Sequence, residues 1–89
     1  MGTIDILKLK NMFSALANEK RLRIIELCST KGYTITELSK KVGLNYSITV
    51  EYTSMLEKAA LVKKERQDDR TVVVKALIRL SKDGEVNRI

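Results

Sequence analysis

The sequence predicts a mainly α-helical domain that ends in a β-hairpin. Apolar residues recur with helical spacing as far as Ala59, and from Leu61 onward the apolar period becomes two, as in a strand. The chain has 89 residues, which is enough for one small domain whose core is marginal unless a partner adds buried surface. The alternating residues that we expect to face the core are Val72, Val74, Ala76, Ile78 and Leu80.

The first helix is expected from about Ile4 to Ala17, with Thr3 as its cap. Its apolar residues fall on more than one face, whereas a surface helix that covers one core has a single apolar stripe. So short a chain offers little to cover a second stripe. We therefore predict that residues 1–17 form a dimerisation helix, which packs on its own domain on one side and on a second subunit on the other. The expected contacts with that subunit are Ile6, Leu9, Met12 and Phe13.

A second helix is expected from the cap Asn18 to the Lys31-Gly32 pair, and apolar residues cover most of its circumference. It contains Cys28, which we interpret as a small buried hydrophobic residue; an intersubunit disulfide is the alternative. One cysteine and no histidine provide no zinc-ligand set and no Ser–His or Cys–His pair. We therefore expect no enzyme, no metal site and no cofactor.

Residues 34–59 predict two helical segments joined by a short turn. Thr34 and Glu37 have the spacing of a capping box, in which each side chain satisfies the other's exposed amide. Gly43 stands where the end of a helix needs a positive φ, and Asn45 can cap a helix that runs to about Ala59. Two helices around a turn that contains glycine form a helix-turn-helix.

Residues 61–80 predict the hairpin, because the strand-like runs LVKKERQ and TVVVKALIRL flank the polar turn Asp68-Asp69-Arg70. Ser81 can then cap a short C-terminal helix. Three helices followed by a hairpin is the order of a winged helix-turn-helix, whose second helix of the pair enters a DNA major groove beside the hairpin, or wing. We therefore expect one domain, residues 1–89, with three helices, a two-stranded wing and a short C-terminal helix.

Several segments resemble a known family. ALANEKRLRIIELC resembles the opening of an ArsR-type domain, and TITELSKKVGLNYSITVEYTSMLEKAALV resembles the family's helix-turn-helix. DDRTVVV and LSKDG resemble the MarR-type wing and the step into its last helix. Over residues 13–84 the chain is thus similar to the ArsR/MarR superfamily, which implies a dimeric regulator of transcription. Two departures stand out: ITELSKK lacks the cysteine pair of the ArsR metal sensors, and Ala60 replaces the usual glycine, at a cost of about 1 kcal/mol if its φ is positive.

The charge balance favours a polyanionic partner. Seventeen Lys and Arg against eleven Asp and Glu give a net charge of +6, which suits nucleic acid first and a membrane surface second; a solvated, lysine-rich surface is the alternative. Residues 43–57 nevertheless contain no Lys or Arg. Because DNA affinity depends mainly on phosphate neutralisation, the cations must come from other segments.

We therefore predict that different residues read bases and bind phosphates. The helix after Asn45 offers nearly uncharged side chains to base edges: Asn45, Tyr46, Ser47, Val50, Glu51 and Ser54. Cations of the turn and wing bind the backbone: Lys40, Lys41, Lys63, Lys64, Arg66 and Arg70, joined by Lys20, Arg21 and Arg23 of the second helix. Three alternatives stay open: Lys63 and Lys64 as solvated residues, Arg70 paired with Asp68 or Asp69, and Tyr46 packed on the domain.

The predicted function is a homodimeric, sequence-specific, DNA-binding regulator of transcription that binds double-stranded DNA and takes no small-molecule ligand. No apolar run is long enough for a membrane span, and we expect a cytoplasmic protein associated with the nucleoid. Two alternatives remain: an architectural protein that coats DNA without sequence preference, and a winged-helix module that binds protein.

Overall fold

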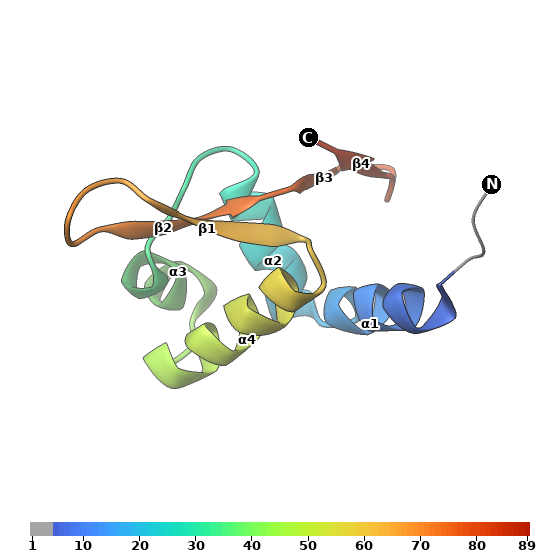
Figure 1. The fold of residues 1–89 in the computed structure, drawn as a ribbon, viewed down its shortest axis with the longest axis horizontal. Coiled ribbons are helices and arrows are strands. Elements are labelled where there is room, and N and C mark those ends of the chain that lie inside the picture. The colour runs from blue at the N-terminus through green and yellow to red at the C-terminus, as the bar shows by residue number, and fades with distance from the viewer. Residues whose placement is uncertain (1–4) are drawn as a thin grey trace.

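The computed structural model describes residues 5–89, and in that part of the chain four helices precede two β-hairpins (Figure 1). The mainly α-helical winged helix-turn-helix is confirmed. The capped segment after Thr34, predicted as helical, forms a full helix, so four helices rather than the stated three precede the wing. The elements are α1 (Ile6–Leu16), α2 (Glu19–Cys28), α3 (Ile35–Val42), α4 (Tyr46–Lys58), β1 (Val62–Arg66), β2 (Val72–Ala76), β3 (Ile78–Leu80) and β4 (Val86–Arg88).

Local side-chain caps set the helix starts. The Asn18 side chain accepts a hydrogen bond from the Arg21 N–H at 3.0 Å, and the Asn45 side chain accepts one from the Ile48 N–H at 2.8 Å. The capping box is present, since the Glu37 N–H donates to Thr34 Oγ1 at 3.1 Å and the Thr34 N–H donates to Glu37 Oε1 at 2.9 Å. The expected cap Thr3 and first helical residue Ile4 lie outside the described residues; in the described part, Asp5 caps α1.

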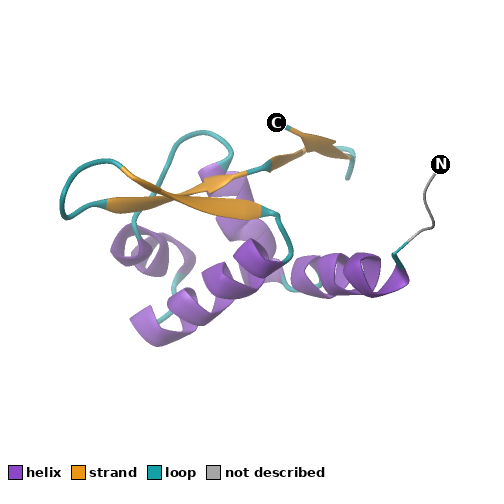
Figure 2. Ribbon diagram, in the orientation of Figure 1, coloured by secondary structure: helices purple, strands orange, loops and turns teal. Residues whose placement is uncertain are grey.

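The core forms where α2 meets α3, α4 and the wing (Figure 2). Ile24 and Ile25 of α2, Leu38 of α3 and Leu56 of α4 have no exposed surface. The buried side of α4 also contains Thr49 and Thr53, whose hydroxyls donate to the carbonyls of Asn45 at 2.8 Å and Thr49 at 2.9 Å. Each threonine therefore packs its methyl group while its hydroxyl is satisfied within the helix.

β1 and β2 form the antiparallel wing, with Val62 opposite Ala76 and Arg66 opposite Val72. The predicted alternation holds for Val74, Ala76 and Ile78, which are buried, and for Leu80, which is partly buried against the core. It fails for Val72, which is 39% exposed because it lies at the outer end of the wing. The predicted long second strand is interrupted at Leu77, whose N–H donates to the Leu61 carbonyl at 2.8 Å.

The residues after Ser81 do not form the short C-terminal helix that the sequence predicted. They turn back and pair β4 with β3, with Leu80 opposite Val86. Ser81 does satisfy a backbone amide as a cap would, since its Oγ accepts from the Glu85 N–H at 3.0 Å. It does so across a hairpin loop, however, in which Gly84 has a φ of 83°. Strand pairing of β-branched Val86 thus replaces a helical turn.

The end of α4 keeps a left-handed residue despite the missing glycine. Ala60 has a φ of 59°. Its N–H donates to the Glu57 carbonyl at 3.0 Å, and the Leu61 N–H donates to the Leu56 carbonyl at 2.9 Å. These two bonds form a Schellman motif, in which the residue at the alanine's position is normally glycine. At α3 the corresponding position is Gly43, with a φ of 76°.

Candidate nucleic-acid interface

The outward face of α4 consists of Tyr46, Ser47, Val50, Glu51 and Ser54. Ser54 is half-buried and the other four are exposed, with 59% of Tyr46 and 37% of Val50 accessible. Thr49, Thr53 and Leu56 on the opposite side fix this orientation, since they are buried in the core. The face therefore offers hydroxyls, one carboxylate and apolar groups, which are side chains that can contact base edges.

The wing tip lies beside the amino end of α4. A hollow of about 340 Å³ separates them, and both Tyr46 and Arg70 line it. The remaining lining comes from the start of α3 with its cap, and from β2 with the residue before it: Thr34, Ile35, Thr36, Thr71, Val72 and Val74. The structure thus brings one predicted base-reading residue and one predicted phosphate-binding residue to the same concave surface. The Tyr46 ring remains mostly exposed there, rather than packed on the domain.

The wing divides its cations between two faces. Along β1, Lys64 and Arg66 lie on the same face as buried Val62, because side chains alternate in a strand. The Lys64 ammonium pairs with Glu57 of α4 at 3.5 Å. Lys63 lies on the opposite face of the wing from Lys64 and Arg66. The alternation of side chains along a strand could have predicted this separation from the sequence.

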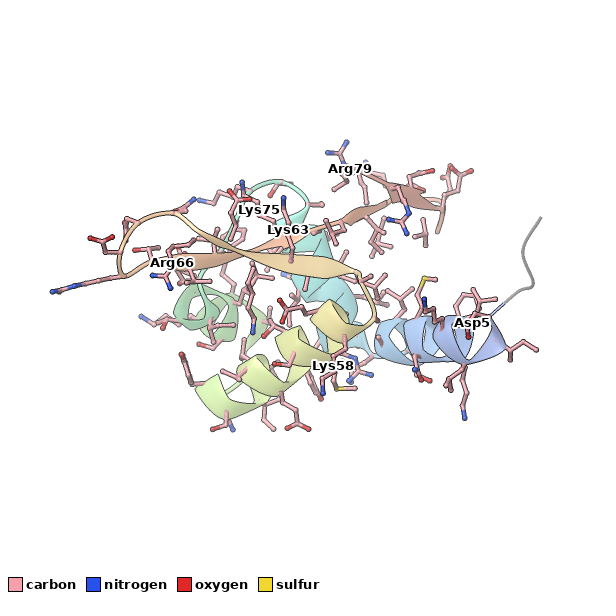
Figure 3. The ribbon with its side chains drawn as sticks, in the orientation of Figure 1. Asp5, Lys58, Lys63, Arg66, Lys75 and Arg79 are labelled. Carbon is pink, nitrogen blue, oxygen red and sulfur yellow. The ribbon has the colours of Figure 1, made fainter. Side chains whose placement is uncertain are left out.

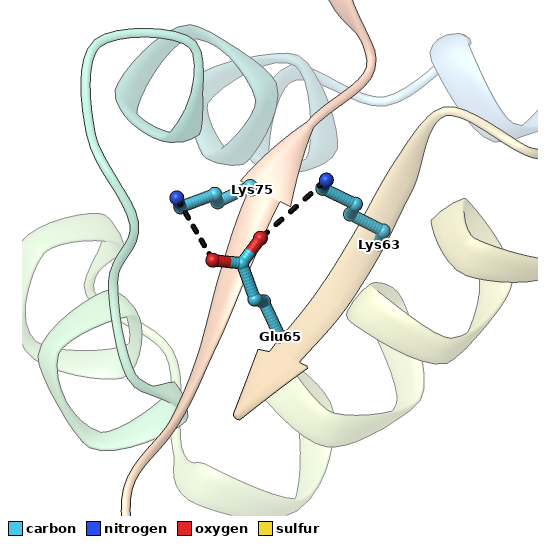
Figure 4. Close-up of polar contacts among 3 residues, drawn as sticks. All are labelled: Lys63, Glu65 and Lys75. Carbon is cyan, nitrogen blue, oxygen red and sulfur yellow. Dashed lines mark hydrogen bonds and ion pairs between the residues drawn. The ribbon is translucent and has the colours of Figure 1, made fainter. Parts of the chain in front are cut away.

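On that opposite face, Glu65 stands between two lysines (Figure 4). Its carboxylate is 3.2 Å from the Lys75 ammonium and 3.4 Å from the Lys63 ammonium. The hydrogen bond from Lys75, followed by that lysine's charge and by Lys63, holds the pKa of Glu65 below its ordinary value. These side chains remain substantially exposed, so the pairs contribute little to stability, and Lys63 shares its charge with a carboxylate.

At the wing tip, Asp68 binds the backbone of the turn. Its Oδ1 accepts from the Arg70 N–H at 2.9 Å and from the Thr71 N–H at 2.8 Å. These hydrogen bonds, first that of Arg70, lower the pKa of the Asp68 carboxyl. Arg66 donates from Nη1 to the Asp69 carbonyl at 3.1 Å. Across residues 5–89 the Arg70 guanidinium forms no ion pair with a carboxylate, so its charge is available at the tip.

The cations around the turn have different partners. Lys40 and Lys41 are both exposed in the last turn of α3. The Lys41 ammonium lies 5.7 Å from the centre of the Tyr33 ring. Lys20 donates from Nζ to the Val42 carbonyl at 2.9 Å and so caps the end of α3, and Arg23 is exposed.

Arg21 is not a phosphate ligand, contrary to the prediction, because it is only 9% exposed. Its Nε donates to the Ala15 carbonyl at 2.7 Å and its Nη2 to the Ser14 carbonyl at 3.0 Å. The guanidinium also lies 4.9 Å from the centre of the Tyr52 ring on α4. Arg21 therefore joins the end of α1 to α4. Its spacing from buried Ile24 and Cys28 was the sequence signal for an inward position.

α1 has the two stripes that the sequence predicted. Ala15 is buried and Met12 is partly buried against the core, so Met12 belongs to the domain side of the helix. Ile6, Leu9 and Phe13, spaced by three and four residues, form an exposed stripe with 77%, 36% and 62% of their surfaces accessible. A contact between this stripe and a second subunit stays a prediction.

Cys28 is buried, with 3% of its surface exposed, and burial raises the pKa of its thiol to about 12. This environment matches the small hydrophobic residue rather than the intersubunit disulfide. Within residues 5–89, no three His, Cys, Asp or Glu side chains are grouped to hold a metal ion. None of the helices in that range combines the length and apolar character needed to cross a membrane.

Comparisons with known proteins agree with this geometry. The sequence model of the winged helix-turn-helix family matches residues 21–80, whereas no curated protein sequence is significantly similar to the chain. The structure of NolR from Sinorhizobium fredii is similar with a TM-score of 0.73 and 27% identity, covering 85% of this chain and 81% of NolR. Reduced HlyU from Vibrio cholerae has a TM-score of 0.68 and 27% identity, covering 79% of this chain and 73% of HlyU.

A third similar structure shares the fold at lower identity. It is the homodimeric winged helix-turn-helix DNA-binding domain of a possible ArsR-family transcriptional regulator from Mycobacterium bovis. Its TM-score is 0.71 at 21% identity, and the match covers 85% of this chain and 74% of that domain.

Proposed function

We propose that this chain, which belongs to the winged helix-turn-helix family, is an ArsR-like DNA-binding regulator of transcription that acts as a homodimer. The observation that supports this most directly is the hollow shared by Tyr46 at the start of α4 and Arg70 at the wing tip. With α4 in a major groove, the wing would lie along the adjacent backbone or in the minor groove. A narrow A·T-rich minor groove attracts arginine.

Two classes of contact would operate. The outward face of α4 contacts base edges through the hydroxyls of Ser47 and Ser54, through Val50 on a thymine methyl and through Glu51 on a cytosine amino group. Asn45 and Tyr46 contribute at the amino end of the helix. Affinity comes from cations on phosphates: Lys40, Lys41, Lys64, Arg66 and Arg70, with Lys63 on the other face of the wing.

Glu51 favours sequence-specific reading over architectural coating. It is exposed on the outward face of α4, where its negative charge opposes binding to any phosphate backbone. A protein that coats DNA gains nothing from such a group. A carboxylate that accepts a hydrogen bond from cytosine N4 offsets this repulsion only at the correct sequence.

The exposed stripe of α1 supports the homodimer. Two subunits related by a two-fold axis would present their α4 helices to successive major grooves about 34 Å apart, so the target would be an inverted repeat. Such a protein binds DNA without catalysis, and in the cell it would be found in the cytoplasm with the nucleoid.

Selection of bound duplexes from a random library, together with the mass of the protein in solution, tests this function. We expect one enriched inverted repeat and a dimer. Binding to all duplexes without enrichment would indicate the architectural alternative. No binding to any duplex at low salt would indicate a protein-interaction module instead.

A further inference from the structure

A second concave surface lies between α1 and the carboxyl end of α4, away from the wing. Two hollows of about 230 and 330 Å³ adjoin there, and Asn11, Lys58 and Ala59 line both of them. Their linings also include apolar groups of Ala15, Met12 and Met55, together with Lys8. We call this surface the α1–α4 groove. It combines an apolar floor with two ammonium groups and one amide.

Lys58 extends the outward face of α4 by one turn at its carboxyl end. It follows Ser47, Glu51 and Ser54 at intervals of four, three and four residues, which is the repeat of a single helix face. Figure 3 shows its side chain at the carboxyl end of α4. It is also the only cation in α4, so a helix that is otherwise without positive charge has one lysine on its outward side.

Lys8 reaches the same groove from α1. It precedes Asn11 and buried Ala15 at intervals of three and four residues, so all three lie on the side of α1 that contacts α4. This side differs from the exposed stripe of Ile6, Leu9 and Phe13. Within residues 5–89, neither Lys8 nor Lys58 forms an ion pair with a carboxylate, so both charges are available to an external anion.

We propose that the α1–α4 groove binds a phosphate of the DNA backbone. Lys58 and Lys8 supply positive charge, and the Asn11 amide donates a hydrogen bond. This inference rests on the proposed function, because α4 must lie in a major groove for its carboxyl end to approach the duplex. α1 is the helix expected at the two-fold axis, so the bound phosphate lies between the two half-sites. The groove thus anchors the inner end of α4, while the wing anchors the outer end.

The salt dependence of duplex binding measures this contact. We would determine Kd for the selected inverted repeat between 50 and 200 mM salt for the wild type, Lys58→Ala and Lys8→Ala. Each phosphate contact contributes about 0.9 to the slope of log K against log salt. Removal of one lysine from both subunits should therefore reduce the magnitude of this slope by about two. It should also raise Kd roughly tenfold or more at 0.1 M salt.

Lys82→Ala is the matched control, because Lys82 is an exposed cation in the turn between β3 and β4 and its loss changes the net charge equally. Lys58→Arg should retain the wild-type slope. Ethylation of single phosphates should interfere with wild-type binding at the centre of the repeat, and that interference should be absent with Lys58→Ala. Thermal unfolding of each variant checks that the fold is intact.

The outcomes separate the two proposals. If the wild type binds the repeat and Lys58→Ala has the same slope as Lys82→Ala, the groove does not hold a phosphate, while the proposed function stands. Central interference that persists in Lys58→Ala leads to the same conclusion. If the wild type binds no duplex, the proposed function fails and this inference fails with it.

Discussion

α1 and α4 are surface helices of similar length, 11 and 13 residues, and they expose different chemistry. α1 exposes large apolar side chains along its stripe of Ile6, Leu9 and Phe13, with 77%, 36% and 62% of their surfaces accessible. α4 exposes mainly polar side chains and buries Thr49 and Thr53. An apolar stripe gains free energy when another apolar surface covers it, whereas hydroxyls and a carboxylate suit the hydrated edges of bases. The difference supports the proposal that α1 contacts a second subunit and that α4 contacts nucleic acid.

Arg21 joins these two helices. Its guanidinium binds two carbonyls at the end of α1 and stacks on Tyr52 of α4. A positive charge at a helix carboxyl end is favourable because it complements the helix dipole. Arg21 thus adds a polar link to the apolar packing of Ala15, Met12 and Leu16 that places α1 against the rest of the domain.

The largest expected effect follows from a charge in the exposed stripe of α1. Phe13→Glu should produce monomers, because a carboxylate cannot be desolvated in an apolar interface without a partner. A monomer meets only one half-site, so affinity for the inverted repeat should fall by roughly 10² or more. Sedimentation and duplex titration measure both effects. Leu7→Glu is the control, since Leu7 is 65% exposed but lies off the stripe; an intact Phe13→Glu dimer would remove α1 from the interface.

Arg21→Met should destabilise the fold by about 2–3 kcal/mol, because the carbonyls of Ser14 and Ala15 lose their donors and Tyr52 loses its cation. Denaturant unfolding measures the change. Arg23→Met, at an exposed neighbour, should stay within about 0.5 kcal/mol of the wild type. Equal effects of the two substitutions would show that Arg21 does not hold α1 against α4.

These residues also show how far the sequence could predict the structure. Helix starts were predictable because the caps are local: Asn18, Thr34 and Asn45 each bind an amide three residues ahead. Arg21 was wrongly predicted as a surface cation because basic side chains are usually exposed. Its partners are the carbonyls at the end of α1 and the Tyr52 ring, and the sequence does not show that the fold brings them together. The C-terminal hairpin was missed because Ser81 can bind an amide in a helix or in a loop.

In the candidate site, the face of α4 was predicted correctly, whereas the arrangement of the cations was not. The outward face of α4 follows from helical periodicity, and the structure places Tyr46, Ser47, Val50 and Glu51 on it as expected. The wing cations were treated as one group, although strand alternation already separates Lys63 from Lys64. Lys58, the lysine proposed to bind phosphate, was not predicted because it is the last residue of α4 and follows a segment that contains no Lys or Arg. Its partners in the groove belong to α1, and only the fold brings them together.

Arg70→Ala should weaken duplex binding and reduce the salt dependence by about one charge per subunit. Its effect should be smaller than that of Phe13→Glu, because one contact is lost rather than a half-site. Lys82→Ala, remote from the wing, provides the reference slope. If the slope of Arg70→Ala is unchanged, the wing tip does not bind phosphate, and α4 with its neighbours must account for the affinity.

The smallest expected effect concerns the end of α4. Ala60→Gly should stabilise the protein by about 0.5 kcal/mol, since relief of the left-handed strain, about 1 kcal/mol, exceeds the added entropy of the unfolded chain, about 0.5 kcal/mol. Ala59→Gly is the matched control: Ala59 has a φ of −83°, so the same replacement should destabilise there. Thermal unfolding distinguishes the two signs. Destabilisation by both glycines would mean that Ala60 carries no strain, and that the Schellman hydrogen bonds alone determine how α4 ends.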